Sequence, residues 1–77
     1  MAKQTLYSLS KGRAATVRKF LHDDDIMPIR LRDLGLIEGG SVLALSGGGR
    51  GGIASYLIKG AVIALREEDC LNIVVSA

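Results

Sequence analysis

The chain has 77 residues, of which 48% are hydrophobic, so it can bury the core of one small domain and is too apolar for disorder. Its formal net charge of +2 comes from ten lysines and arginines against eight acidic residues, and the basic residues are spread along the chain. Nucleic-acid-binding domains usually gather basic residues on one face beside aromatic side chains, and here the aromatic residues are two tyrosines and one phenylalanine. We therefore expect no nucleic-acid partner.

Targeting and redox signals favour the cytoplasm. The N-terminus lacks the apolar stretch of a signal peptide, and no segment approaches the roughly 20 apolar residues that cross a bilayer. The lone cysteine, Cys70, excludes an internal disulfide and fits a reducing compartment. We expect a soluble cytoplasmic protein that reaches a membrane only through a partner.

The first strand is predicted after a turn near the N-terminus. Spaced leucines end at the turn Lys11-Gly12, and residues 14–21 then have the composition of a strand with Val17 and Leu21 facing inward. Phe20 falls on the opposite face from Val17, because strand side chains alternate. A β-bulge around residues 18–20 would correct this, so we predict one there.

One short helix is predicted in the middle of the chain. Pro28 suits the first helical position, because its φ is fixed and its missing N–H is not needed there. Leu31 and Leu34 are three residues apart and share the face that would cover the sheet. Gly35 fits the left-handed position after the last turn, and Leu36 can fold back onto that turn.

The second half of the chain alternates apolar runs with glycine-containing turns, which indicates strands. Lys59-Gly60 is predicted to form a tight hairpin turn. The predicted elements are strands at Val42–Leu45, Ile53–Ile58 and Ala61–Leu65, a helical turn at residues 67–71, and a last strand at Ile73–Val75. Five short strands, one helix and a helical turn predict a single mainly β domain over residues 1–77, a partly open SH3-like barrel.

The glycine run Gly47–Gly52 formally matches G-x-G-x-x-G, the motif of dinucleotide-binding folds. That motif needs a following helix whose N-terminus receives the pyrophosphate. Here the β-branched and aromatic segment Ile53–Ile58 follows, which is typical of a strand. We therefore reject nucleotide binding and predict a flexible hairpin tip.

Two other groups of residues have metal-ligating or nucleophilic chemistry. His22 and the aspartates at positions 23–25 offer ligands for a divalent metal, but neighbouring residues cannot all point at one ion, so a solvated acidic loop before the helix is the stronger interpretation. Cys70 is flanked by acids that raise the pKa of a thiol, and we expect it to be a small buried residue. With no catalytic pair or triad, the sequence predicts a binding module and not an enzyme, and we expect no cofactor.

These elements together resemble the ferrous-iron transport protein A family (FeoA-like domains) over nearly the whole chain. The matching segments are Leu6–Val17 with Leu9-Ser10-Lys11-Gly12 inside it, Arg30-Leu31, Leu34-Gly35-Leu36, Gly39 with Val42, Lys59-Gly60 with Ala64-Leu65-Arg66, and Asp69–Val75. Glu38 stands where the family often has proline, Cys70 where it usually has alanine, and the run Gly47–Gly52 is looser than in most members.

The resemblance implies an SH3-like barrel that serves as a small cytoplasmic accessory of FeoB, a GTP-dependent ferrous-iron transporter of the bacterial inner membrane. It also implies that the protein acts on the cytoplasmic G-protein portion of that transporter and does not itself carry iron. Two alternatives stay open: a free-standing metal- or ligand-responsive barrel that binds ferrous ion through residues 22–25, and, third, a nucleic-acid-binding barrel.

We expect an apolar patch at one end of the barrel to dock on the transporter. The candidate residues lie off the face that holds Leu31 and Leu34, in the turn after the helix, or on a strand. They are Met27, Ile29, Leu36, Ile37 and Tyr56. The alternative is that all five belong to the core of a small domain.

Overall fold

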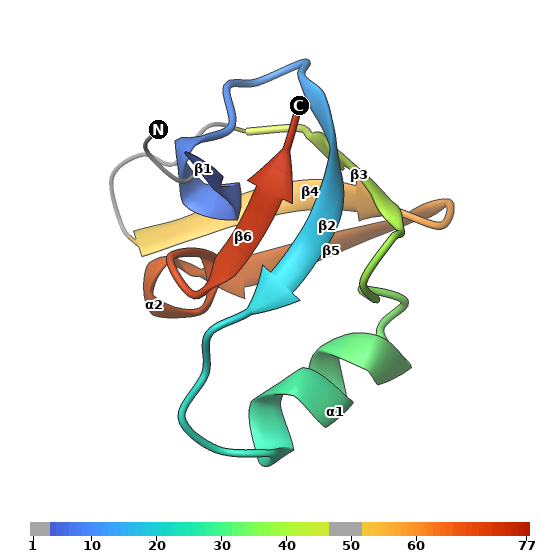
Figure 1. The fold of residues 1–77 in the computed structure, drawn as a ribbon. Helices are drawn as coiled ribbons and strands as arrows, with labels where there is room; N and C mark the ends of the chain where they lie inside the picture. The colour runs from blue at the N-terminus through green and yellow to red at the C-terminus, as the bar shows by residue number, and fades with distance from the viewer. Residues whose placement is uncertain (1–3, 47–51) are drawn as a thin grey trace.

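The computed structural model describes residues 4–46 and 52–77. Within these residues, six antiparallel strands form one sheet that curls into a small barrel, in the order β1-β6-β2-β3-β4-β5 (Figure 1). The elements are β1 (Gln4–Thr5), η1 (Leu6–Ser8), β2 (Ala14–Phe20), α1 (Ile26–Asp33), β3 (Ser41–Ala44), β4 (Ile53–Ile58), β5 (Ala61–Arg66), α2 (Glu67–Cys70) and β6 (Ile73–Ser76). The predicted mainly β class with one helix and a helical turn is confirmed. The sixth strand is β1, a two-residue strand that pairs with β6 and was not predicted.

The predicted bulge in β2 is confirmed. Val17 pairs with Val75 and Lys19 pairs with Val74, so the register against β6 shifts and Arg18 is the extra residue. The shift lets Val17 be fully buried while Phe20, three residues later, still packs against the core. Arg18 turns outward, where its Nε donates a hydrogen bond to Ser76 Oγ at 2.7 Å.

Helix α1 begins two residues before the predicted Pro28, and the reason is the aspartate loop ahead of it. Oδ1 of Asp24 accepts hydrogen bonds from the backbone N–H groups of Ile26 and Met27, both at 2.9 Å. Those donors have no partner inside the helix, so the carboxylate supplies one and lets the helix start early. Pro28 is therefore the third helical residue.

The predicted end of α1 is confirmed in detail. Gly35 has φ +100, its N–H donates to Arg32 O at 2.9 Å, and Leu36 N–H donates to Leu31 O at 2.8 Å. This pair of bonds is the Schellman motif, in which an apolar contact accompanies the turn. Leu31 and Leu36 are both buried, whereas Leu34 is 47% exposed, so the prediction that Leu34 covers the sheet is wrong. Leu34 is the residue just past the last helical turn, where the chain has already turned away from the helical face that holds Leu31.

The hairpin of β4 and β5 forms one side of the barrel and has the predicted turn. Lys59 has φ +49 and Gly60 has φ +80, the signs that a type I′ turn requires at both central residues. Six consecutive residue pairs, from Ile58–Ala61 to Ile53–Arg66, join the two strands. The predicted glycine-run tip lies outside the described residues except for Gly52.

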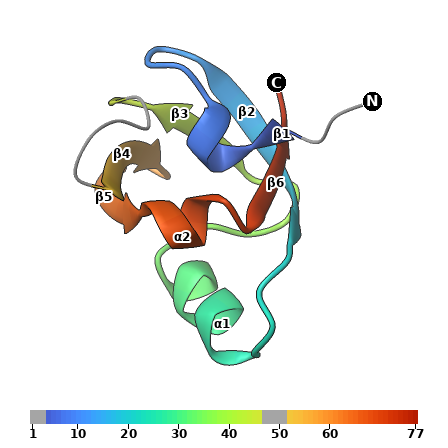
Figure 2. The ribbon, with the colours of Figure 1, turned by 90° about the vertical axis from the view of Figure 1, so that its left-hand side faces the viewer.

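Helix α1 lies below the barrel as a separate layer, on the side of the barrel where α2 lies (Figure 2). Among the described residues, no helix is long and apolar enough to span a membrane.

Candidate functional site

The predicted docking residues separate into a surface group around α1 and a buried group. Ile29 is 47% exposed, and Met27 and Ile37 are partly buried. Ile26 is 63% exposed and lies three residues before Ile29, so the two share a helical face turned toward solvent. The exposed surface of α1 therefore has an apolar face beside the charged residues Arg30, Arg32 and Asp33.

Leu36 and Tyr56 are core residues, so the expectation that they are exposed is wrong. Leu36 is 1% exposed because the Schellman turn folds it back onto Leu31. Tyr56 is fully buried on β4, and its hydroxyl donates a hydrogen bond to Leu6 O at 3.1 Å. Burial raises the pKa of the Tyr56 hydroxyl far above its usual range. The sequence could not separate these two from surface residues, because both stand in apolar segments.

A groove of about 240 Å³ runs along one side of α1, and we call it the α1 groove. Its lining residues are Phe20, Pro28, Ile29, Arg32, Leu36, Ile37 and Glu38. It brings together three of the five predicted docking residues, since Leu36 contributes to its floor while Ile29 and Ile37 stand at its sides. Arg32 and Glu38 give it one positive and one negative charge. Sequence reasoning missed Phe20, whose position depends on the bulge at Arg18.

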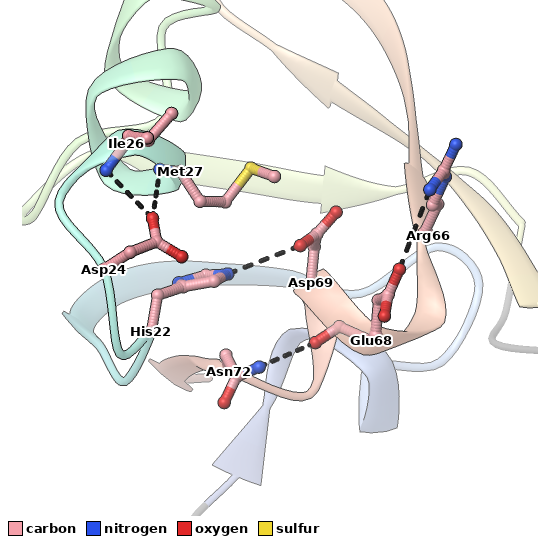
Figure 3. Close-up of polar contacts among 8 residues, drawn as sticks. All are labelled: His22, Asp24, Ile26, Met27, Arg66, Glu68, Asp69 and Asn72. Atoms are coloured by element: carbon pink, nitrogen blue, oxygen red, sulfur yellow. Dashed lines mark hydrogen bonds and ion pairs between the residues drawn. The ribbon is translucent and has the colours of Figure 1, made fainter.

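Within the loop of residues 22–25, His22 and Asp24 have different partners (Figure 3). His22 points toward α2, where its Nε2 lies 3.5 Å from Oδ1 of Asp69, whereas Asp24 turns to the N-terminus of α1. The described residues contain no group of three or more histidines, cysteines or acids that could hold a metal ion. The His22 side chain is only 7% exposed, and neither ring nitrogen has a hydrogen-bond partner.

The Asp24 carboxylate is an electrostatic anchor for α1. Its pKa is lowered from the usual value because it accepts the hydrogen bonds of Met27 and Ile26, with a smaller electrostatic contribution from the nearby Arg30. The interpretation of this loop as an acidic entry to the helix is confirmed for Asp24. The aspartate therefore has a structural use that competes with metal binding.

Cys70 is the small buried residue that the sequence predicted. It is fully buried on α2, and burial raises the pKa of its thiol, with Asp69 and Glu67 raising it further. A hydrogen bond with Tyr56 acts in the opposite direction and is smaller than the burial effect. A protonated, enclosed thiol is a poor nucleophile, so Cys70 is a packing residue.

Comparison with known proteins gives one family. The family model of the FeoA domain matches residues 4–77. The FeoA protein of Chlorobium tepidum has a similar solution structure, with 25% sequence identity and a TM-score of 0.85, and the alignment covers 95% of this chain and 69% of that one. No curated protein matches the chain.

Two further structures show how widely the fold is used. The zinc complex of Stenotrophomonas maltophilia FeoA is 30% identical with a TM-score of 0.80, over 95% of this chain and 89% of that one. It is described as a prokaryotic SH3 domain protein and a candidate ferrous iron transport activating factor, so the predicted SH3-like barrel is confirmed. A manganese-dependent transcriptional repressor bound to manganese has a TM-score of 0.89 at 20% identity. The chain spans only 37% of that repressor, which shows the fold alone.

Proposed function

Because this chain belongs to the FeoA family, we propose that it is an accessory protein of GTP-dependent ferrous-iron transport. It acts in the cytoplasm, where it docks on the GTPase region of a FeoB-type transporter and modulates that transporter. Family membership supports the role in iron transport. The α1 groove supports the docking, and it is the single observation that carries this part of the proposal.

The α1 groove has the features of a protein interface. An apolar floor and sides, provided by Phe20, Leu36 and Ile37, are bordered by the charges of Arg32 and Glu38. Interfaces commonly combine an apolar centre with a polar rim, and a few central apolar residues contribute most of the binding free energy. Ile29, exposed at the side of the groove, is the residue that we expect a partner to cover.

The test is an amide NMR titration of this protein with the cytoplasmic GTPase region of a matching transporter. Ile29→Lys places a charge at the groove, and Leu71→Lys is its matched control, because Leu71 is 46% exposed and lies outside the groove. We expect the chemical shift changes to gather at residues 20, 28–29 and 36–38. Ile29→Lys should weaken binding at least about tenfold, a loss typical of a central interface residue, while Leu71→Lys should not.

If both variants bind as well as the unaltered protein, the α1 groove is not part of the interface. If the unaltered protein does not bind the GTPase region, the proposal of docking is wrong. An anaerobic titration of this protein with ferrous ion is the control for the titration with the GTPase region. Saturable chemical shift changes at His22 and Asp69 on adding iron, with none on adding the GTPase region, would contradict docking and favour the metal-responsive alternative.

The metal-responsive alternative has one specific observation in its favour. The buried His22 ring has two nitrogens without hydrogen-bond partners and lies 3.5 Å from the Asp69 carboxylate. A neutral imidazole and a carboxylate are both ligands for divalent transition metals. They are only two ligands, so an ion held there would keep several waters and bind weakly.

A further inference from the structure

Strand β5 lies at the end of the sheet, and among residues 4–46 and 52–77 no strand pairs with its second edge. The pairing with β4 shows which backbone groups face outward. Ser55 directs both its N–H and its C=O toward Ser46 and Leu45, so it does not exchange hydrogen bonds with Ala64, the residue opposite it on β5. In an antiparallel ladder such pairs alternate with bonded pairs. Val62 and Ala64 therefore present their N–H and C=O groups at the free edge. Arg66 presents only its N–H there, because it is the N-cap of α2 and its C=O accepts the first hydrogen bond of that helix.

Helix α1 runs alongside this free edge, in the direction opposite to that of β5. At one end, a Cβ built on Gly35 would lie 3.4 Å from side-chain atoms of Ile58 and Lys59, so the end of α1 meets the β4–β5 turn. At the other end, His22 and Asp69 join the segment before α1 to α2 (Figure 3). Between these two contacts the helix and the strand are separated by a groove of about 340 Å³.

We call this space the β5 groove, and it differs from the α1 groove in lying on the other side of the helix. Leu65 and Ala64 contribute its strand side. Met27 and Leu31 of α1 and Leu34, just past the end of the helix, contribute apolar side chains from the other side. Arg30 lines the groove at the middle of the helix. At the α2 end, Glu68 and Asp69 line it together with Arg66, which pairs with Glu68 at 3.7 Å, so that end keeps a net negative charge. The groove thus combines unpaired backbone groups, an apolar wall and an ordered distribution of charge.

We infer that the β5 groove binds an extended segment of a partner protein, which adds to the sheet as a strand antiparallel to β5. The unpaired groups of an edge strand can be satisfied by another backbone, and peptides commonly bind proteins by adding a strand to an exposed sheet edge. Antiparallel addition puts the amino end of the segment at Glu68 and Asp69 and its middle beside Arg30. The segment is therefore basic at its amino end, acidic at its centre, and apolar at alternate residues.

The inference does not depend on the proposed function, because it is tested without iron or a transporter. The probe is a seven-residue peptide blocked at both ends, with lysine at its amino end, glutamates at its centre and carboxyl end, and valines or threonines between. We expect amide shifts at Val62, Ala64 and Arg66 and none at Phe20 or Ile37 of the α1 groove. A peptide of the same composition in reversed order places a glutamate, in place of the lysine, beside Glu68 and Asp69, and it should bind more weakly.

Ala64→Pro is the decisive variant. It removes an N–H that faces the free edge and is not used by β4, and proline is tolerated on edge strands for that reason. Affinity for the peptide should fall by about tenfold or more, whereas Ala64→Ser, which keeps the N–H, should bind within about twofold of the unaltered protein. Retained binding by a folded Ala64→Pro protein would overturn strand addition.

A second measurement decides the question if Ala64→Pro fails to fold. The same peptide with N-methyl groups on alternate amides cannot form the ladder, and it is titrated into the unaltered protein. Loss of binding with one set of methylated amides and retention with the other set supports strand addition, since only one edge of the peptide faces β5. Equal binding of both, or no binding of the parent peptide at millimolar concentration, would refute it.

Discussion

The barrel and helix α1 are held in place by different kinds of contact. The strands share continuous antiparallel pairs from β1 to β5 and a common apolar core. Helix α1 has one fully buried residue, Leu31, and Met27 packs against the core beside it. Asp24 fixes the start of the helix and the Schellman turn at Gly35 fixes its end. The barrel therefore carries the stability of the domain, whereas α1 can be altered with less global cost. Both grooves border α1, so binding is expected where the structure is least constrained by packing.

The largest expected effect is on the barrel side of this comparison. Tyr56→Ala removes a fully buried aromatic ring and should lower the free energy of unfolding by about 3–5 kcal/mol, as measured by chemical denaturation. Tyr56→Phe keeps the ring and removes only the hydroxyl, with its hydrogen bonds to Leu6 O and to Cys70, so it should cost about 1–2 kcal/mol. If the two variants were equally destabilised, the hydroxyl and not the packing would be the main contribution.

Leu31→Ala tests whether α1 is attached mainly through one side chain. Loss of a buried leucine costs about 2–5 kcal/mol when the whole fold depends on it. Here the expected result is local: amides of residues 27–34 should exchange much faster in hydrogen-exchange NMR, while Val17 and Val75 in the paired strands stay protected. Equal loss of protection in α1 and in the strands would show that helix and barrel unfold as one unit.

The same contrast explains what the sequence could predict. Regular alternation, the Lys59-Gly60 turn and the interrupted pattern at Arg18 all report local conformation. Five of the six described strands, the turn and the bulge were predicted from them, whereas β1 was not. Whether a side chain is buried depends on how its element lies against other elements, and local sequence does not report that. Leu34 and Leu36 are both leucines beside Gly35, yet one is 47% exposed and the other 1%, because the turn redirects the chain between them.

The candidate site was predicted only in part for the same reason. Ile29 is exposed and Ile37 is partly buried, whereas Tyr56 lies in the core. The sequence could not separate them, because an apolar residue in a strand has the same pattern whether its face is buried or exposed. The β5 groove had no sequence signal at all. It depends on α1 meeting the β4–β5 turn at Gly35 and α2 through His22 and Asp69, contacts between segments far apart in the chain.

Gly35→Ala should have an intermediate effect, because it forces a side chain into the left-handed region at φ +100. We expect a loss of about 1 kcal/mol or more in the free energy of unfolding, together with faster exchange of the Leu36 amide that closes the turn. Gly35→Asn is the matched control, since asparagine tolerates this conformation better than alanine. Equal losses would point to crowding against Ile58 instead of backbone strain.

Asp24→Asn has the smallest expected effect, and it should be visible only at acid pH. Because the folded-state pKa of Asp24 lies below its usual value, its stabilising contribution is complete above about pH 4 and is lost as the pH falls through the lowered pKa. Asparagine also caps helices but does not titrate there. Amide exchange at Ile26 and Met27, measured from pH 5 downward, should accelerate in the unaltered protein and change less in the variant. Parallel profiles would mean that another group sets the acid response of α1, and the early start of the helix would then need a cause other than this carboxylate.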